Sequence, residues 1–274
     1  MKAQSPEQPP RIVLLGAGRL ASHLAHALLR HPEAGTLVQL YSRSRASVER
    51  LAQELAERYD TRGLAFTTEL TELLPEADIY LFVLSDDALP ELWQRLEGRT
   101  RGLWVHCSGA TSLGRLLEYH PQGAVLYPLQ TFSRERAAAG SYLPFYIEGS
   151  DATSLAKVRR LAELLGDEVH EATSAQRLYL HLGAVLACNF SNYLVLEAER
   201  LLEREGLPPK ALLPLLDELL MKLHALPARE ALTGPAARGD EATMQRHEEL
   251  LTGEPELQQL YRLLSERIQQ RLRS

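Results

Sequence analysis

Residues 11–21 constrain the fold of this chain more than any other stretch. They read RIVLLGAGRLA, in which the apolar run 12–15 is typical of a strand buried on both faces. The pattern G-x-G-x-x-A then supplies a tight turn, a backbone that can approach a pyrophosphate, and a small residue where helix meets strand. A helix beginning here would direct free N–H groups at an anion. We predict a dinucleotide held by Gly16, Ala17, Gly18, Arg19 and Leu20; the alternative is a glycine turn kept for packing.

The apolar pattern beyond this motif predicts an α/β fold followed by an all-α region. We expect strands at 12–15, 36–41, 65–67, 78–84, 102–107 and 124–127, with helices at 45–58, 69–74, 88–97 and 113–119. Two further strands, 145–148 and 168–171, flank a helix at 152–165. Strands alternating with helices indicate a parallel, doubly wound Rossmann sheet. From residue 174 onward we expect helices at 174–205, 209–226, 240–251 and 256–271.

This reading divides the chain into a flexible tail at 1–10, a Rossmann domain at 11–173 and a helical domain at 174–274. The net charge of −6 argues against a nucleic-acid partner and an anionic membrane surface. We expect no apolar stretch of membrane-spanning length, and a cytoplasmic setting. Cys107 and Cys188 match no metal or redox spacing. His23 and His26 lack a third ligand, so we read them as surface residues and predict no metal.

The end of the second predicted strand bears on the type of dinucleotide. A carboxylate that binds the adenosine ribose is usual there, but this chain has Ser42, Arg43 and Ser44 instead. A guanidinium between two hydroxyls suits a ribose phosphate, because Arg presents a planar fork of donors. The sequence therefore favours NADP over NAD. The alternative is a solvated basic turn ahead of a helix.

The carboxyl ends of the other strands line the crevice where such sheets bind ligands. Near the cofactor we expect three sets of residues: Leu84, Ser85 and Asp86; Ser108 and Gly109; and Pro128, with Gln130 beside it toward the substrate. Each set has a structural alternative. Asp86 or Asp87 would cap the helix at 88–97, His106 reads as a packed histidine, and the segment from Pro128 to Phe132 could form a simple loop.

The long helix from 174 carries polar residues among apolar neighbours. At about 100° per residue His181, Cys188 and Asn192 share one face, and Asn189 lies to one side. We predict His181 as proton donor or acceptor, because imidazole titrates near neutral pH, and Asn189 as the group that holds a polar atom of the substrate. Asn192 would also contact the substrate. The alternative is hydrogen bonding across a dimer or domain interface.

A turn-rich segment, LTGPAARGD, connects two of the later helices. Its Gly-Pro pair fixes the backbone, and Arg238 and Asp240 could bind or orient a polar group of the substrate. Alternatively, Asp240 caps the helix that follows.

Taken in order, these segments resemble a known family. The matching pieces are GAGRLA, Ser42–Ser44, Leu84–Asp86, His106–Gly109, Tyr127–Phe132, Tyr179 to Asn192, and Thr233–Pro235 with Arg238–Asp240. They are similar to Rossmann-like NADP oxidoreductases of the deazaflavin-dependent NADP reductase-like type, with a helical C-terminal domain of unknown function. The layout is more distantly similar to pyrroline-carboxylate reductase, ketopantoate reductase and the β-hydroxyacid dehydrogenases. The resemblance to these relatives implies a homodimer whose C-terminal helices build the substrate pocket.

One departure from these relatives bears on mechanism. The β-hydroxyacid dehydrogenases carry a catalytic lysine on the long helix, whereas the lysines of this chain are Lys2, Lys157, Lys210 and Lys222. His181 lies in the corresponding region. We expect hydride transfer between nicotinamide and a small carbonyl or imine, with His181 in place of a lysine. The alternatives are an NADP(H)-binding sensor or scaffold without turnover and an imine reductase. No separate deazaflavin-binding motif is evident.

Overall fold

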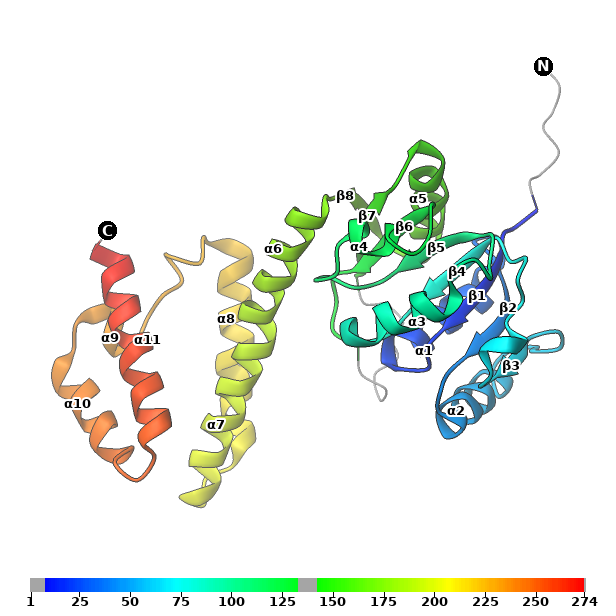
Figure 1. Ribbon diagram of the computed structural model, residues 1–274. Coiled ribbons are helices and arrows are strands. Elements are labelled where there is room, and N and C mark those ends of the chain that lie inside the picture. The colour runs from blue at the N-terminus through cyan, green and yellow to red at the C-terminus, as the bar shows by residue number, and fades with distance from the viewer. Residues whose placement is uncertain (1–7, 133–141, 274) are drawn as a thin grey trace. The chain divides into compact units, whose positions relative to one another are not determined.

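The structure is a computed structural model that describes residues 8–132 and 142–273 (Figure 1). Most of the expected tail, residues 1–7, lies outside the described residues. The chain forms two compact units, and the division falls between Phe190 and Ser191. The sequence placed the boundary between residues 173 and 174. The division instead lies inside the long helix, because the first turns of that helix pack on the sheet domain.

The first unit is built on an eight-stranded sheet in the order β3-β2-β1-β4-β5-β6-β7-β8. All neighbouring strands are parallel except the antiparallel pair β6 and β7. The strands are β1 (Arg11–Leu15), β2 (Thr36–Tyr41), β3 (Ala65–Thr67), β4 (Ile79–Phe82), β5 (Leu103–His106), β6 (Gly123–Pro128), β7 (Pro144–Gly149) and β8 (Glu168–Glu171). The predicted doubly wound fold is confirmed, and β7 is the antiparallel addition that the apolar pattern could not reveal.

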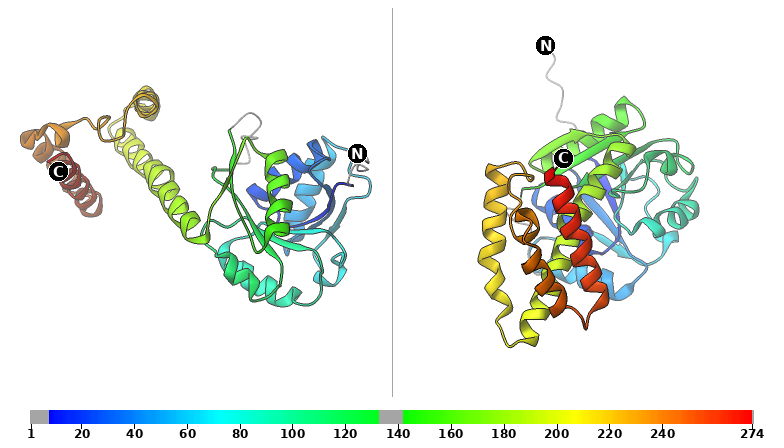
Figure 2. Two further views of the ribbon diagram at one scale, coloured as in Figure 1. Left: turned by 90° about the horizontal axis from the view of Figure 1, so that it is seen from above. Right: turned by 90° about the vertical axis from the view of Figure 1, so that its left-hand side faces the viewer.

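Helices cover both faces of this sheet, as the left view of Figure 2 shows. They are α1 (Arg19–Arg30), α2 (Arg45–Ala56), α3 (Leu89–Leu96), α4 (Leu113–Leu117) and α5 (Ala152–Leu165). A further helix, α6 (Ser174–Ala184), follows β8. Short 3-10 turns lie at Leu70–Glu72 and Asp86–Ala88.

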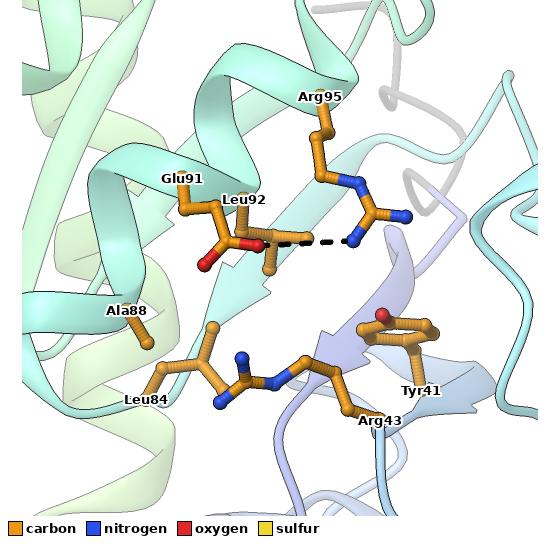
Figure 3. Close-up of a pocket in the computed structure, with 7 residues that line it drawn as sticks. All are labelled: Tyr41, Arg43, Leu84, Ala88, Glu91, Leu92 and Arg95. Carbon is orange, nitrogen blue, oxygen red and sulfur yellow. Dashed lines mark ion pairs between the residues drawn. The ribbon is translucent and has the colours of Figure 1, made fainter.

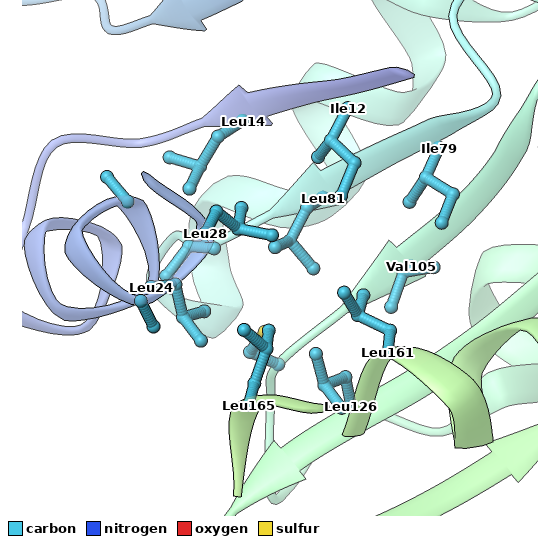
Figure 4. Packing of buried hydrophobic residues seen from close by; sticks show 14 of the residues in the cluster. Ile12, Leu14, Leu24, Leu28, Ile79, Leu81, Val105, Leu126, Leu161 and Leu165 are labelled. Atoms are coloured by element: carbon cyan, nitrogen blue, oxygen red, sulfur yellow. The ribbon is translucent and has the colours of Figure 1, made fainter. Parts of the chain in front are cut away.

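Alternate residues of each central strand enter opposite layers of the core. Ile12 and Leu14 of β1 pack with Leu24 and Leu28 of α1 and with α5 (Figure 4). Their neighbours Val13 and Leu15 pack on the other face, around Trp93 of α3. Because both faces of the sheet are buried, the side chains on both sides of each central strand are apolar. This explains the continuous apolar run in the sequence.

The second unit is helical. It contains α7 (Ser191–Arg204), α8 (Leu213–Ala225), α9 (Pro235–Arg238), α10 (Glu241–Leu250) and α11 (Pro255–Arg273), with a 3-10 turn at Pro209–Leu212. The long helices match the predicted ones, except that the predicted helix from 174 is interrupted by a π-helical segment, Val185–Phe190. The short helix α9 lies in the segment that was expected to be a turn-rich connection.

One helical segment corrects an expectation. Ser174–Arg204 is long and apolar enough, by length and composition, to cross a membrane, and none of its most apolar window is buried. Polar residues interrupt this segment, so it contains no uninterrupted apolar run. Core helices of soluble proteins pass the same test, so the segment by itself does not indicate a membrane protein.

Candidate functional site

The turn between β1 and α1 has the geometry of a phosphate cradle. Gly16 adopts φ +134°, and a Cβ placed there would lie 2.1 Å from the backbone oxygen of Val83. This position therefore requires glycine. A Cβ at Gly18 would meet no atom of the described residues within 4 Å. Gly18 begins α1 without a side-chain cap, so the first N–H groups of α1 are available to an anion, as a bound dinucleotide diphosphate would require.

The turn after β2 contains the predicted Ser42, Arg43 and Ser44. Both hydroxyls serve the local backbone: Ser42 Oγ accepts from the N–H of Ser44, and Ser44 Oγ caps α2 by accepting from the N–H of Ser47 at 3.3 Å. Arg43 is exposed and lines a small pocket (Figure 3). Of the three residues, Arg43 is therefore the one whose side chain faces a pocket.

This pocket also contains a second arginine that the sequence did not single out. Arg95 of α3 lines it together with Tyr41 and Leu84, and an ion pair of 4.0 Å joins Arg95 to Glu91 on the same helix (Figure 3). Burial raises the pKa of Tyr41, while the charges of Arg95 and Arg43 oppose that shift. Two guanidinium groups thus act on one position at the end of β2.

A larger cleft of about 500 Å³ lies at the carboxyl ends of β5 and β6. It brings together six residues that were predicted from the sequence: Arg19, Leu20, Pro128, Gln130, His181 and Asn189. Eight other residues complete its lining: Cys107, Tyr127, Leu129, Thr131, Phe132, Ala184, Val185 and Cys188. Ser85 and Asp86 are exposed after β4 and do not line this cleft.

Tyr127 and His181 form a hydrogen-bonded pair inside this cleft. Tyr127 Oη lies 3.3 Å from His181 Nδ1, and the rings meet edge to face with centroids 6.2 Å apart. Tyr127 is 8% exposed. Burial raises the pKa of Tyr127, Arg177 opposes this and Asp86 adds to it. The sequence did not mark Tyr127 as functional, because a tyrosine that ends a buried strand looks like a core residue.

The loop that follows β5 packs directly on this pair. A Cβ at Gly109 would lie 2.9 Å from His181 Cγ, from His181 Nδ1 and from Tyr127 Cε2. Ser108 Oγ accepts from the N–H groups of Ala110 and Thr111, so this hydroxyl shapes the loop. Gly109 therefore sets the distance between the loop and the tyrosine–histidine pair.

A buried arginine holds the same loop. Arg177 of α6 is 1% exposed; its Nε donates to the backbone oxygen of Ser108 at 3.2 Å, and its Nη2 donates to that of Thr111 at 2.7 Å. Its Nη1 lies 2.6 Å from Glu148 Oε2 on β7. Arg177 therefore fixes the loop, β7 and the helix that carries His181 one turn later. The sequence gives no signal for this role, because an arginine at the start of a helix is typical of a surface charge.

His106 is a packed histidine, as its alternative reading supposed. It is fully buried, its Nδ1 accepts from the N–H of Ser108 at 3.2 Å, and its Nε2 has no hydrogen-bond partner among the described residues. Burial, with a smaller contribution from the charge of Arg177, lowers its pKa to about 3. His106 is therefore neutral at physiological pH.

The π-helical segment changes which residues of the long helix share a face. Helical spacing placed Asn189 to one side of His181 and Cys188, yet all three line the cleft. The i→i+5 hydrogen bonding of a π-helix widens the turn, and such segments frequently mark functional sites. Asn192 follows in the second unit and is exposed.

The remaining predicted residues, Arg238 and Asp240, belong to the second unit. Asp240 caps α10: its Oδ1 accepts from the N–H of Thr243 at 3.1 Å, and its Oδ2 accepts from the Thr243 hydroxyl at 2.8 Å. These hydrogen bonds lower the pKa of Asp240. The capping role that the sequence offered as its alternative is thus formed. Arg238 is exposed.

The histidines of α1 differ from the expectation of surface residues. His26 is largely buried against Glu54, with Nε2 and Oε1 2.8 Å apart. The ring of His23 contacts that of Phe132, with centroids 5.0 Å apart, and burial lowers the pKa of His23, helped by Arg30 and His26. Across residues 8–132 and 142–273, no group of three or more His, Cys, Asp or Glu side chains is arranged to hold a metal.

Comparison with known proteins identifies relatives over the full chain. Residues 143–268 match a domain of unknown function, DUF2520. A candidate NADP oxidoreductase from Bacteroides fragilis is 39% identical, with a TM-score of 0.87 over 96% of this chain and 99% of that one. A Thermotoga maritima protein is 23% identical, with a TM-score of 0.75 over 96% and 100% of the two chains. A search of curated proteins gives no match.

A more distant likeness concerns the fold alone. Plasmodium falciparum pyrroline carboxylate reductase, whose structure has NADP bound, is 13% identical, with a TM-score of 0.59 over 97% of this chain and 99% of that one. The Bacteroides fragilis protein, at 39% identity, confirms the resemblance that the sequence motifs indicated. The chain therefore belongs to the family of that protein, the Rossmann-fold NADP oxidoreductase-like proteins with a helical C-terminal domain of unknown function.

Proposed function

We propose that this protein is an NADP-dependent oxidoreductase that reduces a small carbonyl or imine, or oxidises the corresponding alcohol or amine. One observation carries the proposal: the cradle at Gly16–Gly18 and the cleft containing Tyr127 and His181 both lie where parallel strands of one sheet end. Ligands of doubly wound sheets bind at that edge. The similarity to the Bacteroides fragilis protein supports the same function.

The residues of the first unit suit NADP. Gly18, Arg19 and Leu20 would hold the diphosphate at the start of α1, with Gly16 and Ala17 forming the turn. Ser42, Arg43 and Ser44 would face the adenosine ribose, with Arg95 adding a second positive charge. Leu84, Ser85, Asp86, Ser108, Gly109 and Pro128 would border the rest of the cofactor. When bound, the cofactor supplies or accepts the hydride.

The chain's own part in the reaction is to orient the substrate and manage its proton. His181 would exchange a proton with the substrate heteroatom, and Asn189 would hold a polar atom of the substrate from the same side of the cleft. Gln130 lines this cleft too. Asn192, Arg238 and Asp240 are proposed to contribute to the substrate pocket from the helical unit, Asp240 by orienting its neighbours while it caps α10.

We further propose a homodimer formed through the C-terminal helices. Large apolar side chains are exposed on α7 and α8: Tyr193, Leu194, Leu196, Leu213, Leu215, Leu219, Leu220, Met221 and Leu223. Exposed apolar faces of this kind mark interaction surfaces, and homodimer interfaces are more apolar than transient ones. Light scattering should give twice the chain mass, and Leu220→Glu should give the monomer. Leu117→Glu, at an exposed leucine of α4, is the control.

Binding and turnover are tested separately. NADP should raise the melting temperature of the wild-type protein more than NAD does, because a ligand of the folded state stabilises it by mass action. Arg43→Ala should remove this preference, whereas Arg45→Ala, two residues away and exposed, should keep it. Equal stabilisation by NAD would contradict the assignment of NADP.

Turnover is measured as NADPH oxidation with a cyclic imine, a 2-ketoacid and an aldehyde. Oxidation with any of them supports the proposed reaction, and the preferred class distinguishes an imine reductase from a carbonyl reductase. Tight NADP binding without oxidation across the panel would instead favour the sensor or scaffold alternative.

A further inference from the structure

We propose that Tyr127 is the proton donor to the substrate and that His181 acts through it, as a relay that resupplies the proton. This inference rests on the proposed function and changes its assignment, because the sequence placed His181 itself at the substrate. Its basis is the juxtaposition of Tyr127 Oη and His181 Nδ1, 3.3 Å apart, on the wall of the cleft.

The ring nitrogen that makes this contact determines the direction of the relay. In a neutral imidazole with its proton on Nε2, Nδ1 is an acceptor and Tyr127 donates to it. In a protonated imidazole, Nδ1–H donates to Tyr127 Oη, and the phenolic O–H is then free to donate to a third group. A substrate oxygen or nitrogen in the cleft would be that third group.

The proton and electron balance of carbonyl reduction follows. The hydride for the carbonyl carbon, and with it the two electrons, would be supplied by bound NADPH. As the C=O π bond breaks, the oxygen takes the proton of Tyr127 Oη, and Tyr127 takes the Nδ1 proton of His181. The imidazolium becomes neutral, and the product is the alcohol.

The surroundings of Tyr127 suit a donor. Its side chain is almost fully buried, which favours the neutral phenol, so the proton stays on Oη until the substrate needs it. The charged groups that act on it are Arg177 from α6, which opposes this effect, and Asp86 after β4, which adds to it. A separation of 3.3 Å is long for an O–H···N hydrogen bond, and catalytic hydrogen bonds commonly tighten when substrate binds.

Gly109 lets the loop after β5 pack closely against both rings. The contacts of 2.9 Å that a Cβ would make with both rings show that the loop after β5 lies against Tyr127 and His181 together. Arg177 fixes this loop through Ser108 and Thr111, and it also fixes α6 one helical turn before His181. One buried side chain thus holds both the helix that carries His181 and the loop that packs on the two rings, which limits the movement of His181 relative to that loop.

The first test needs no substrate. Nitrogen-15 NMR of histidine-labelled protein reports the tautomer of His181, identified by its loss in His181→Gln. We expect Nδ1 of His181 to be an acceptor in the wild type at pH 8 and its signal to shift in Tyr127→Phe, which removes Oη alone. Tyr146→Phe is the control, because Tyr146 lies opposite Tyr127 across β6 and β7 but does not line the cleft, and its ring stacks on that of His170 with centroids 5.2 Å apart. An unchanged His181 signal in Tyr127→Phe would overturn the relay.

The second test uses whichever imine, ketoacid or aldehyde the wild type reduces. Tyr127→Phe should lower kcat by about 10²–10⁴-fold, the usual contribution of a proton donor, while the Kd for NADPH stays the same. Tyr146→Phe should keep both values. An unchanged kcat in Tyr127→Phe would overturn the role of Tyr127 as donor. If the wild type reduces none of the probes, the proposed function fails on that ground, and the NMR result still judges the pair.

Discussion

Arg177 Nη1 lies 2.6 Å from Glu148 Oε2 in the interior of the first unit, so helix α6 is bound to strand β7 by a buried ion pair. The side chain of Arg177 is 1% exposed and that of Glu148 is 22% exposed. The same arginine donates to two backbone oxygens of the loop after β5. One residue thus holds together the three elements that surround Tyr127 and His181.

Replacing this arginine should be costly. Arg177→Met removes the donor to two backbone oxygens and leaves the carboxylate of Glu148 with the Ser174 hydroxyl but without its cationic partner. Removing one partner of a buried pair typically costs about 3–5 kcal/mol. We expect a loss of this order in the free energy of unfolding, measured with urea. Arg159→Met is the control: its pair with Glu171 is partly exposed, and such pairs contribute about 0–1 kcal/mol. Equal losses in the two variants would contradict a structural role of Arg177.

The same substitution, glycine to alanine, should have opposite effects on stability at two positions of the first unit. Gly109→Ala places a Cβ 2.9 Å from both His181 and Tyr127, and overpacking of this kind costs about 1–3 kcal/mol. Gly183→Ala, on α6, places its Cβ more than 4 Å from other atoms in the part of the chain that the structure describes, and should stabilise the helix by up to about 1 kcal/mol. Urea unfolding measures both. If Gly109→Ala is as stable as the wild type, the loop does not pack on the pair.

The glycine motif offers a second matched comparison. Gly16→Ala combines a positive φ with a contact of 2.1 Å to the backbone of Val83, so the unliganded protein should lose at least about 2 kcal/mol of stability. Gly18→Ala meets nothing within 4 Å, so its stability should stay within about 0.5 kcal/mol of the wild type.

The two variants differ again when NADP is added. The methyl group of Gly18→Ala would occupy the space of the diphosphate, so the rise in melting temperature with NADP should be lost although the fold is intact. A full rise in this variant would show that the diphosphate lies elsewhere.

The parts of the fold that local patterns encode could be predicted from the sequence. Strand β2 at Thr36–Tyr41 and the turn at Gly16 follow from apolar runs and glycine spacing. The grouping of Tyr127 with His181 could not be predicted, because 54 positions separate them. The contacts of Arg177 that hold α6 against the loop after β5 and against β7 are equally distant in sequence. The position of Asn189 on the same side as His181 and Cys188 could not be predicted either, because a π-helical turn has no sequence signature of its own. The antiparallel direction of β7 could not be predicted either, because an apolar run does not encode the direction of a strand.

Buried His106 predicts how the stability of the first unit depends on pH. Its pKa is about 3 in the folded chain, against an ordinary value of 6.5, because burial and the charge of Arg177 disfavour the imidazolium. When the pH falls below 6.5, the unfolded chain therefore takes up the proton first, and protonation favours unfolding. The stability that neutral His106 allows above pH 6.5 should be lost progressively as the pH falls toward 3, at about 1.4 kcal/mol per pH unit.

His106→Gln can still accept from the N–H of Ser108 but does not titrate, so urea unfolding of the two proteins at pH 7, 6, 5 and 4 isolates the contribution of this residue. The difference in unfolding free energy should narrow and then reverse in favour of the variant as the pH falls, and a difference that stays constant from pH 7 to 4 would show that His106 titrates alike in the folded and unfolded chains.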